Sequence, residues 1–256
     1  MKQFKVGLQL FSIREALEAD FEGTLQKVKY IGYDYVEFCN KHFFDKSGKE
    51  VKEILDRIGL ECFSVHQDHW WFSQDKQNVI NKIVDVGAKY CTLPWYNPEA
   101  WNNDWNSAIK DVAEFSEYAR NAGLKFYYHN HGTELNKIDG EYIIDKMLKE
   151  FPNGEVNPQF DVAFFLKTEE NPAEYIKKYS GRVDLVHLKD AVLKEADGEI
   201  KLESVSVGCG SLDIPAILEA CEQAGTEYII VEQSSLPDFS LDGVKASRDY
   251  LKSLGL

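Results

Sequence analysis

The chain has 256 residues, of which 44% are hydrophobic and 28% are charged, a composition typical of globular enzymes. Its formal net charge of −14 argues against binding a nucleic-acid backbone or an anionic membrane surface. No apolar run reaches the roughly 18 residues of a transmembrane helix, and the first residues show no signal sequence. The five cysteines are scattered and include no Cys-x-x-Cys pair, which indicates a reducing compartment. We therefore expect a cytoplasmic protein with neither a nucleic-acid nor a membrane partner.

A repeated glycine pattern divides the chain into strand and helix units. After a first strand at residues 6–10, each of seven glycines ends a helical segment and precedes a short β-rich run: Gly32, Gly59, Gly87, Gly123, Gly154, Gly181 and Gly225. The segments between the strands have apolar residues at helical spacing, as in Leu25, Val28 and Ile31. Eight such units predict an α/β fold, a single (β/α)8 TIM barrel over residues 1–256. A doubly wound sheet is disfavoured because no Gly-x-Gly-x-x-Gly follows the first strand.

The ends of the expected strands carry polar groups. In chain order the strand ends are Gln9, Glu37, His66, Pro94-Trp95, His129 with His131, Asp161, His187 and Glu232, and all except the fourth are polar or titratable. Barrel enzymes place their reactive groups at this end of the strands. Asp161 alone would suit a cap, His187 a core histidine and Glu232 a salt bridge. Together with one strand-five histidine, they would instead form a mixed nitrogen and oxygen site for one divalent ion such as Mn, Co or Zn.

Several motifs, in this order along the chain, resemble one enzyme family. They are Gly7-Leu-Gln-Leu-Phe-Ser-Ile-Arg14, Tyr35-Val-Glu37-Phe38, Tyr127-Tyr-His129-Asn-His131, Asp161, Val186-His187-Leu-Lys-Asp190, Val207-Gly-Cys-Gly-Ser-Leu-Asp-Ile-Pro215 and Ile230-Val-Glu232-Gln233. The whole chain is similar to sugar phosphate isomerases/epimerases of the xylose isomerase-like TIM barrel superfamily, which includes D-tagatose 3-epimerase, inosose dehydratase and endonuclease IV. The resemblance implies one divalent ion on His129, Asp161, His187 and Glu232, with a ketose bound to that ion.

The chain departs from the epimerases at two positions. His129 stands where they have a carboxylate, and Phe164 stands where they have a histidine after the strand-six aspartate. Proton transfer between two carboxylates is therefore not implied. An acid–base pair of Glu232 and a histidine would suit isomerisation, one-sided proton transfer or dehydration of a keto-sugar. Which of His129 and His131 is the strand-five ligand stays open on the residues alone.

Further roles at the site follow from the same motifs and strand ends. We expect Glu232 to be the general base, with His131 and Glu134 acting beside it on the substrate. The expected substrate contacts are Glu37, His66, Trp95 and Lys189. A solvated position at the rim is the alternative for Lys189.

Two loop features bear on the substrate. All five tryptophans fall in the loops after the third and fourth strands, where they would form a wall over a sugar. Loop packing or a homo-oligomer contact explains them equally well. The turn from Val207 to Gly210 resembles a phosphate cradle, but no Lys or Arg is adjacent to it, so an unphosphorylated substrate fits at least as well.

The sequence thus predicts a metal-dependent isomerase or epimerase in carbohydrate metabolism, acting on a sugar or cyclitol. A dehydratase (lyase) of an inosose or keto-sugar is the main alternative. An endonuclease IV-like nuclease is disfavoured, because residues 203–207 contain no histidine and the chain is acidic. A non-catalytic sugar-binding barrel is the last alternative.

Overall fold

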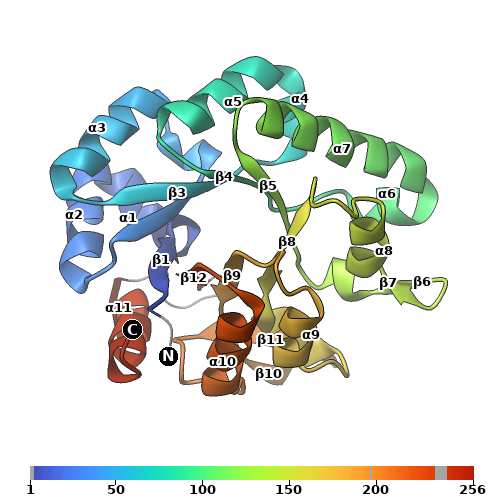
Figure 1. Ribbon diagram of the computed structural model, residues 1–256. Helices are drawn as coiled ribbons and strands as arrows, with labels where there is room; N and C mark the ends of the chain where they lie inside the picture. Colours follow the sequence, from blue (N-terminus) through green and yellow to red (C-terminus); the bar gives the residue numbers. More distant parts are fainter. Residues whose placement is uncertain (1–2, 197, 234–240) are drawn as a thin grey trace.

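The computed structural model of the protein describes residues 3–196, 198–233 and 241–256. Parallel strands close into a barrel that helices surround (Figure 1). The barrel strands are β1 (Lys5–Gln9), β2 (Tyr35–Cys39), β3 (Glu61–His66), β4 (Tyr90–Leu93), β5 (Lys125–His129), β8 (Asn157–Asp161), β9 (Leu185–Leu188) and β12 (Tyr228–Val231). Strand β1 pairs with both β2 and β12, which closes the sheet. The predicted (β/α)8 barrel is confirmed.

Helices connect successive strands around the outside of the barrel (Figure 1). The α-helices are α1 (Arg14–Ala19), α2 (Phe21–Ile31), α3 (Gly48–Ile58), α4 (His69–Gln74), α5 (Lys76–Asp85), α6 (Pro98–Asn103), α7 (Trp105–Asn121), α8 (Ile143–Lys149), α9 (Pro172–Lys178), α10 (Ile214–Ala224) and α11 (Leu241–Ser253). The 3-10 turns are η1 (Leu10–Ile13), η2 (Asn40–Phe43), η3 (Thr133–Leu135) and η4 (Val162–Lys167). Among the described helices, none is long and apolar enough to span a bilayer.

Two of the glycines that were predicted to end helices have backbone angles that explain this role. Gly32 follows α2 with φ of 105°, and Gly59 follows α3 with φ of 81°. In this left-handed region a Cβ atom would clash with the backbone, so glycine is the residue that turns the chain at least cost. Each turn directs the chain back towards the start of the next barrel strand.

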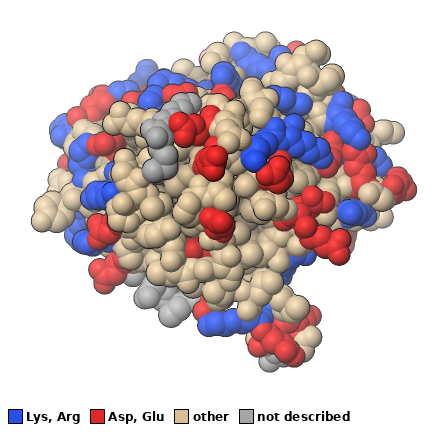
Figure 2. Space-filling view, turned by 60° about the horizontal axis from the view of Figure 1, so that its bottom comes forward, with Lys and Arg blue, Asp and Glu red and all other residues tan. Residues whose placement is uncertain are grey.

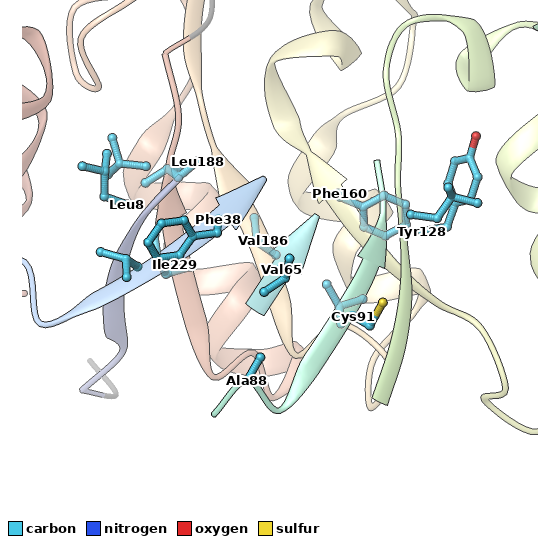
Figure 3. Close-up of a cluster of buried hydrophobic side chains, with 14 of the residues drawn as sticks. Leu8, Phe38, Val65, Ala88, Cys91, Tyr128, Phe160, Val186, Leu188 and Ile229 are labelled. Atoms are coloured by element: carbon cyan, nitrogen blue, oxygen red, sulfur yellow. The ribbon is translucent and has the colours of Figure 1, made fainter. Parts of the chain in front are cut away.

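Strand alternation produces two separate cores. Outward-facing residues pack under the helices, and Figure 3 shows several of them, including Leu8, Phe38, Val186 and Ile229. Inside the barrel, a second cluster forms what we call the aromatic layer: Phe63, Tyr90, Tyr127, Leu185, Tyr228 and Ile230. Phe63 stacks on Tyr228 with ring centroids 4.2 Å apart. This layer fills the barrel below the C-terminal strand ends.

Two antiparallel hairpins are additions to the predicted barrel. The longer one follows β9 and consists of β10 (Asp190–Ala196) and β11 (Glu199–Val205). The shorter one joins β6 (Lys137–Ile138) to β7 (Glu141–Tyr142) before α8. Neither belongs to the closed sheet.

The surface and the cysteines agree with the composition. Figure 2 shows one face of the molecule, on which Lys and Arg side chains are interspersed with Asp and Glu. The five cysteines are all free thiols, and Cys62, Cys91 and Cys221 are buried.

Candidate active site

The C-terminal strand ends bring six ionisable side chains together at one end of the barrel. We call this set the polar ring: Glu37, His66, His129, Asp161, His187 and Glu232. Each of these residues is at most 6% exposed. The two-residue period of a strand explains their direction, because Tyr127 lies in the aromatic layer and His129 follows it on the same face of β5. Burying so much charge costs free energy unless the groups pair with each other or bind a cation.

Four members of the ring could hold a metal ion together. His129, Asp161, His187 and Glu232 each offer one ligand atom, and these atoms all lie within 4.8 Å of one another. They come from the ends of four consecutive strands of the closed sheet, β5, β8, β9 and β12. Two imidazoles and two carboxylates form a donor set that suits Zn, Mn or Co.

His129 fits this role by its own environment. Its Nδ1 atom is buried and has no hydrogen-bond partner within the described part of the chain. Burial, and then the neighbouring His187 and His131, hold the pKa of His129 well below its usual value. The imidazole is therefore neutral at pH 7, as a metal ligand must be. A buried ring nitrogen without a partner is a feature that a bound cation would satisfy.

His187 lies between two carboxylates. Its Nε2 is 2.6 Å from Oε1 of Glu37, and its Nδ1 is 2.6 Å from Oε2 of Glu232. Burial opposes a charge on this ring, but the two carboxylates outweigh burial and raise the pKa of His187 to about 10. To bind a metal ion, His187 has to give up a proton and one of these two hydrogen bonds.

Lys189 supplies a second buried positive charge. Its Nζ is 3.0 Å from Oδ2 of Asp161 and 3.5 Å from Oε1 of Glu232, and the residue is 1% exposed. Burial disfavours the ammonium, but these two carboxylates outweigh burial and raise the pKa of Lys189. The ammonium also lies 5.2 Å from the ring centroid of Phe164. The alternative of a solvated rim lysine is wrong, because the carboxylates of the ring hold Lys189 inside.

A cavity of about 200 Å³ opens above the ring, and we call it the active-site cavity. Its lining includes His66, His129, His131 and Glu232. The rings of His129 and His131 are 4.9 Å apart, and Nδ1 of His131 has no hydrogen-bond partner among the described residues. Burial lowers the pKa of His131, so its imidazole is neutral at pH 7. A larger cavity, of about 460 Å³, lies at the opposite ends of β2 and β3, away from the ring.

Glu134 and Trp95 are among the predicted site residues that do not line the active-site cavity. Glu134 is 1% exposed and accepts hydrogen bonds from the Tyr128 hydroxyl at 2.8 Å and from the His131 backbone N–H at 2.9 Å. Its carboxylate therefore anchors the segment that carries His131. Trp95 is 47% exposed and follows Pro94, which does line the cavity. The structure thus places Trp95 at the rim and Glu134 behind His131.

Glu37 lies beneath the cavity and connects opposite sides of the barrel. Besides His187, its carboxylate contacts Nε2 of His66 at 3.0 Å and accepts from the amides of Gln9 at 2.9 Å and Gln159 at 2.8 Å. Gln159 also meets Nε2 of His66 at 2.7 Å. The sequence analysis assigned no role to Gln159. Its position two residues before Asp161 on β8 is the signal that places it on the same inward face.

The glycine turn after β11 is occupied by the protein's own carboxylate. The backbone N–H groups of Gly208 and Gly210 donate to Oδ2 of Asp190 at 3.0 and 2.8 Å. A Cβ atom added to Gly210 would lie 2.1 Å from Oδ1 of Asp190, so only glycine fits there. This turn resembles a phosphate cradle in sequence, but Asp190 fills the anion position.

Comparisons with known proteins agree with this geometry. The family model described as xylose isomerase-like TIM barrel matches residues 25–254. An inosose dehydratase of Clostridium botulinum (strain Alaska E43 / Type E3) is 27% identical over 92% of this chain and 90% of its own length. Among solved structures, a sugar phosphate isomerase/epimerase from Parabacteroides distasonis has a TM-score of 0.80 at 19% identity, covering 99% of this chain and 97% of that chain.

A zinc-bound IOLI protein superposes with a TM-score of 0.77 at 17% identity, with 98% of each chain covered. At these identities, the solved structures establish the fold, whereas the family model covers nearly the whole sequence. This chain therefore belongs to the xylose isomerase-like TIM barrel family.

Proposed function

We propose that this protein is a cytoplasmic, divalent-metal-dependent sugar isomerase or epimerase that transfers a proton on a ketose. The observation that carries the proposal is the cluster of His129, Asp161, His187 and Glu232, whose ligand atoms lie within 4.8 Å of one another beside the active-site cavity. A bound Mn, Co or Zn ion would supply Lewis-acid stabilisation of the negative charge that develops on a sugar oxygen when a neighbouring carbon loses its proton.

Glu232 is our candidate for the general base. Burial opposes its charge, but the Lys189 ammonium and His187 hold the pKa of Glu232 well below its usual range. It is therefore an ionised carboxylate at neutral pH, and it lines the active-site cavity where a substrate carbon would lie. A positioned carboxylate of this kind can take a proton from one carbon and return it to the next, which is isomerisation.

His131 is our candidate for the second proton-transfer group. Its neutral ring lines the same cavity as Glu232 but comes from the segment after β5. A neutral imidazole can donate from one nitrogen while it accepts at the other. Glu134 would act through His131, because its carboxylate holds the His131 backbone, so we propose it as a positioning residue.

The remaining predicted residues take binding roles in this proposal. His66 lines the cavity and would contact a substrate hydroxyl, and Trp95 would cover one side of the sugar from the rim. Glu37 would hold His66 and His187 in place rather than touch the substrate. Lys189 would face the charge that develops on the sugar, from its position beside Asp161 and Glu232.

A dehydratase is the second candidate function, and two observations favour it. The similarity to an inosose dehydratase extends over 92% of this chain. In addition, the ring has a histidine, His129, where a two-base epimerase would have a carboxylate. In a dehydration, Glu232 would remove a proton next to the carbonyl, and His131 would relay that proton to the departing hydroxyl, which leaves as water.

One incubation separates the two functions. Protein loaded with Mn is mixed in turn with a panel of ketoses and with an inosose, and the products are followed by NMR and by diketone absorbance. The isomerase or epimerase proposal expects a new ketose, epimer or aldose, with loss of the reaction in the presence of a chelator. Loss of water from the inosose without any new sugar isomer would overturn it in favour of the dehydratase. Sugar binding that is indifferent to chelation, without turnover, would favour a binding protein.

A further inference from the structure

A second cavity adjoins the active-site cavity. It has a volume of about 380 Å³, and we call it the side groove; its lining includes Lys41, Phe44, Asp45, Gln67, Trp71 and Lys82. Lys41 lines both cavities, and Gln67 of the side groove is followed directly by Asp68 of the active-site cavity. The groove therefore begins at the mouth of the barrel and runs outwards between the segment after η2 and helices α4 and α5.

The side groove combines ring faces with hydrogen-bonding groups. Trp71 is 53% exposed, although a large indole normally gains free energy by covering its surface. Phe44 and Val79 add further apolar surface. Gln67 supplies an amide and Asp45 a carboxylate to the same lining. Apolar faces with a few placed donors and acceptors are what a sugar ring requires, since its C–H faces are apolar and its edge carries hydroxyls.

Two ammonium groups of the groove lie near aromatic rings rather than in an ion pair. Lys82 lies with Nζ 5.1 Å from the ring centroid of Phe43, and Lys41 lies with Nζ 5.4 Å from that of Phe11. The structure gives neither group an ion pair or hydrogen bond within the described ranges. Burial lowers the pKa of Lys82, although the nearby Asp45 carboxylate opposes this shift. Hydroxyl oxygens of a ligand could replace water as acceptors for both lysines.

We propose that the side groove binds a second, glycosidically linked sugar ring, so that the substrate is a ketose-containing disaccharide or glycoside. This inference rests on the proposed function, which places the reacting ketose of the substrate in the active-site cavity. A phosphate is the competing occupant, because two lysines line the groove. It fits less well, since Asp45 would repel it and the faces of Trp71 and Phe44 would stay uncovered.

The test compares the affinity of the protein for a monosaccharide with its affinity for disaccharides. Isothermal titration of the Mn-loaded protein measures the affinities for fructose and for two glucosyl-fructoses, turanose and palatinose. We expect at least one disaccharide to bind about tenfold more tightly than fructose, which corresponds to about 1.4 kcal/mol. Trp71→Ala should remove this advantage and leave the affinity for fructose unchanged.

Tyr30→Ala is the control. Tyr30 lies on α2, is 93% exposed and does not line the groove, so this variant should keep the disaccharide preference. The proposal is overturned if neither disaccharide binds more tightly than fructose, or if Trp71→Ala and Tyr30→Ala lose the preference equally. It is also overturned if fructose 6-phosphate binds more tightly than both disaccharides and loses that advantage in Lys82→Met.

The same titrations separate this inference from the proposed function. If the protein binds no Mn, the metal-dependent function fails, and the disaccharide preference is then measured on the metal-free protein. If Mn binds and ketoses are converted while disaccharides show no preference, the side groove fails and the proposed function stands.

Discussion

The aromatic layer and the polar ring lie on the same strands and face the same barrel interior, yet their chemistry is opposite. Three strands show the change within two residues: Tyr127 precedes His129, Leu185 precedes His187 and Ile230 precedes Glu232. The aromatic layer gains free energy from burial, whereas the polar ring places histidines and carboxylates, with Lys189 beside them, in a site that penalises charge. The same inward-facing positions of the strands thus supply both a layer that stabilises the fold and a layer that carries the candidate reactive groups.

The largest expected effect concerns the base in the ring. Glu232→Gln keeps the shape of the side chain but removes the charge, so ketose turnover should fall about 10⁴-fold. Glu134→Gln is the matched control, because the glutamine oxygen can still accept from the His131 backbone N–H while its NH2 group donates to the Tyr128 hydroxyl. Its turnover should stay within about tenfold of the wild type. Equal losses in the two variants would contradict the division of roles between Glu232 and Glu134.

The second-largest expected effect is a loss of stability caused by a substitution in the aromatic layer. Phe63→Ala removes a fully buried ring that stacks on Tyr228, so the free energy of unfolding should fall by about 3 to 5 kcal/mol. Chemical denaturation measures this change, with Tyr30→Ala, at a 93% exposed residue, as the neutral control. The folded fraction of Phe63→Ala should still bind Mn with wild-type affinity. A variant that stays folded but loses the ion would show that the two regions are not separable.

A third prediction concerns the pH dependence of metal binding by the polar ring. Because the pKa of His187 is raised to about 10, the ion competes with a proton at every lower pH, and its apparent affinity should rise with pH. One released proton corresponds to about tenfold per pH unit, or about a hundredfold between pH 6 and pH 8. His129 adds nothing to this count, since its lowered pKa leaves it neutral. Calorimetric titration of Mn in buffers of different ionisation enthalpy measures how many protons are released when the ion binds. Release of no proton would contradict the proposed competition between the ion and the His187 proton.

The smallest expected effect comes from Lys189. Its ammonium holds Asp161 and Glu232 and repels a second cation, so Lys189→Met should raise the affinity for Mn about tenfold. Lys178→Met is the control, because Lys178 pairs with Asp145 outside the ring. Calorimetry measures both variants. Weaker Mn binding in Lys189→Met would mean that the lysine supports the ion instead of competing with it.

The barrel could be predicted from the sequence because its signals are local. Glycines at helix ends and short apolar runs suffice to place eight strands, and all of them are found. The hairpin of β10 and β11 was missed, although Asp-Gly at positions 197–198 between two alternating runs is a hairpin signal. Its strands are rich in Lys and Glu and are not needed to complete the eight units.

The site was predictable only as far as strand ends determine it. The ring members could be named because each follows an apolar strand, but the contacts between them depend on the stagger of the closed barrel. The carboxylate of Glu37 meets His187, which is 150 residues away in the chain, and no sequence pattern gives that distance. For the same reason, the burial of Lys189 and the position of Glu134 behind His131 required the structure.

The most direct test of the account is a crystal structure of the Mn-loaded protein with anomalous scattering. We expect one strong anomalous peak in the polar ring, within coordination distance of one atom from each of His129, Asp161, His187 and Glu232. A peak coordinated by other residues, or Mn bound in the crystal with no peak in the polar ring, would contradict this assignment of the ligands.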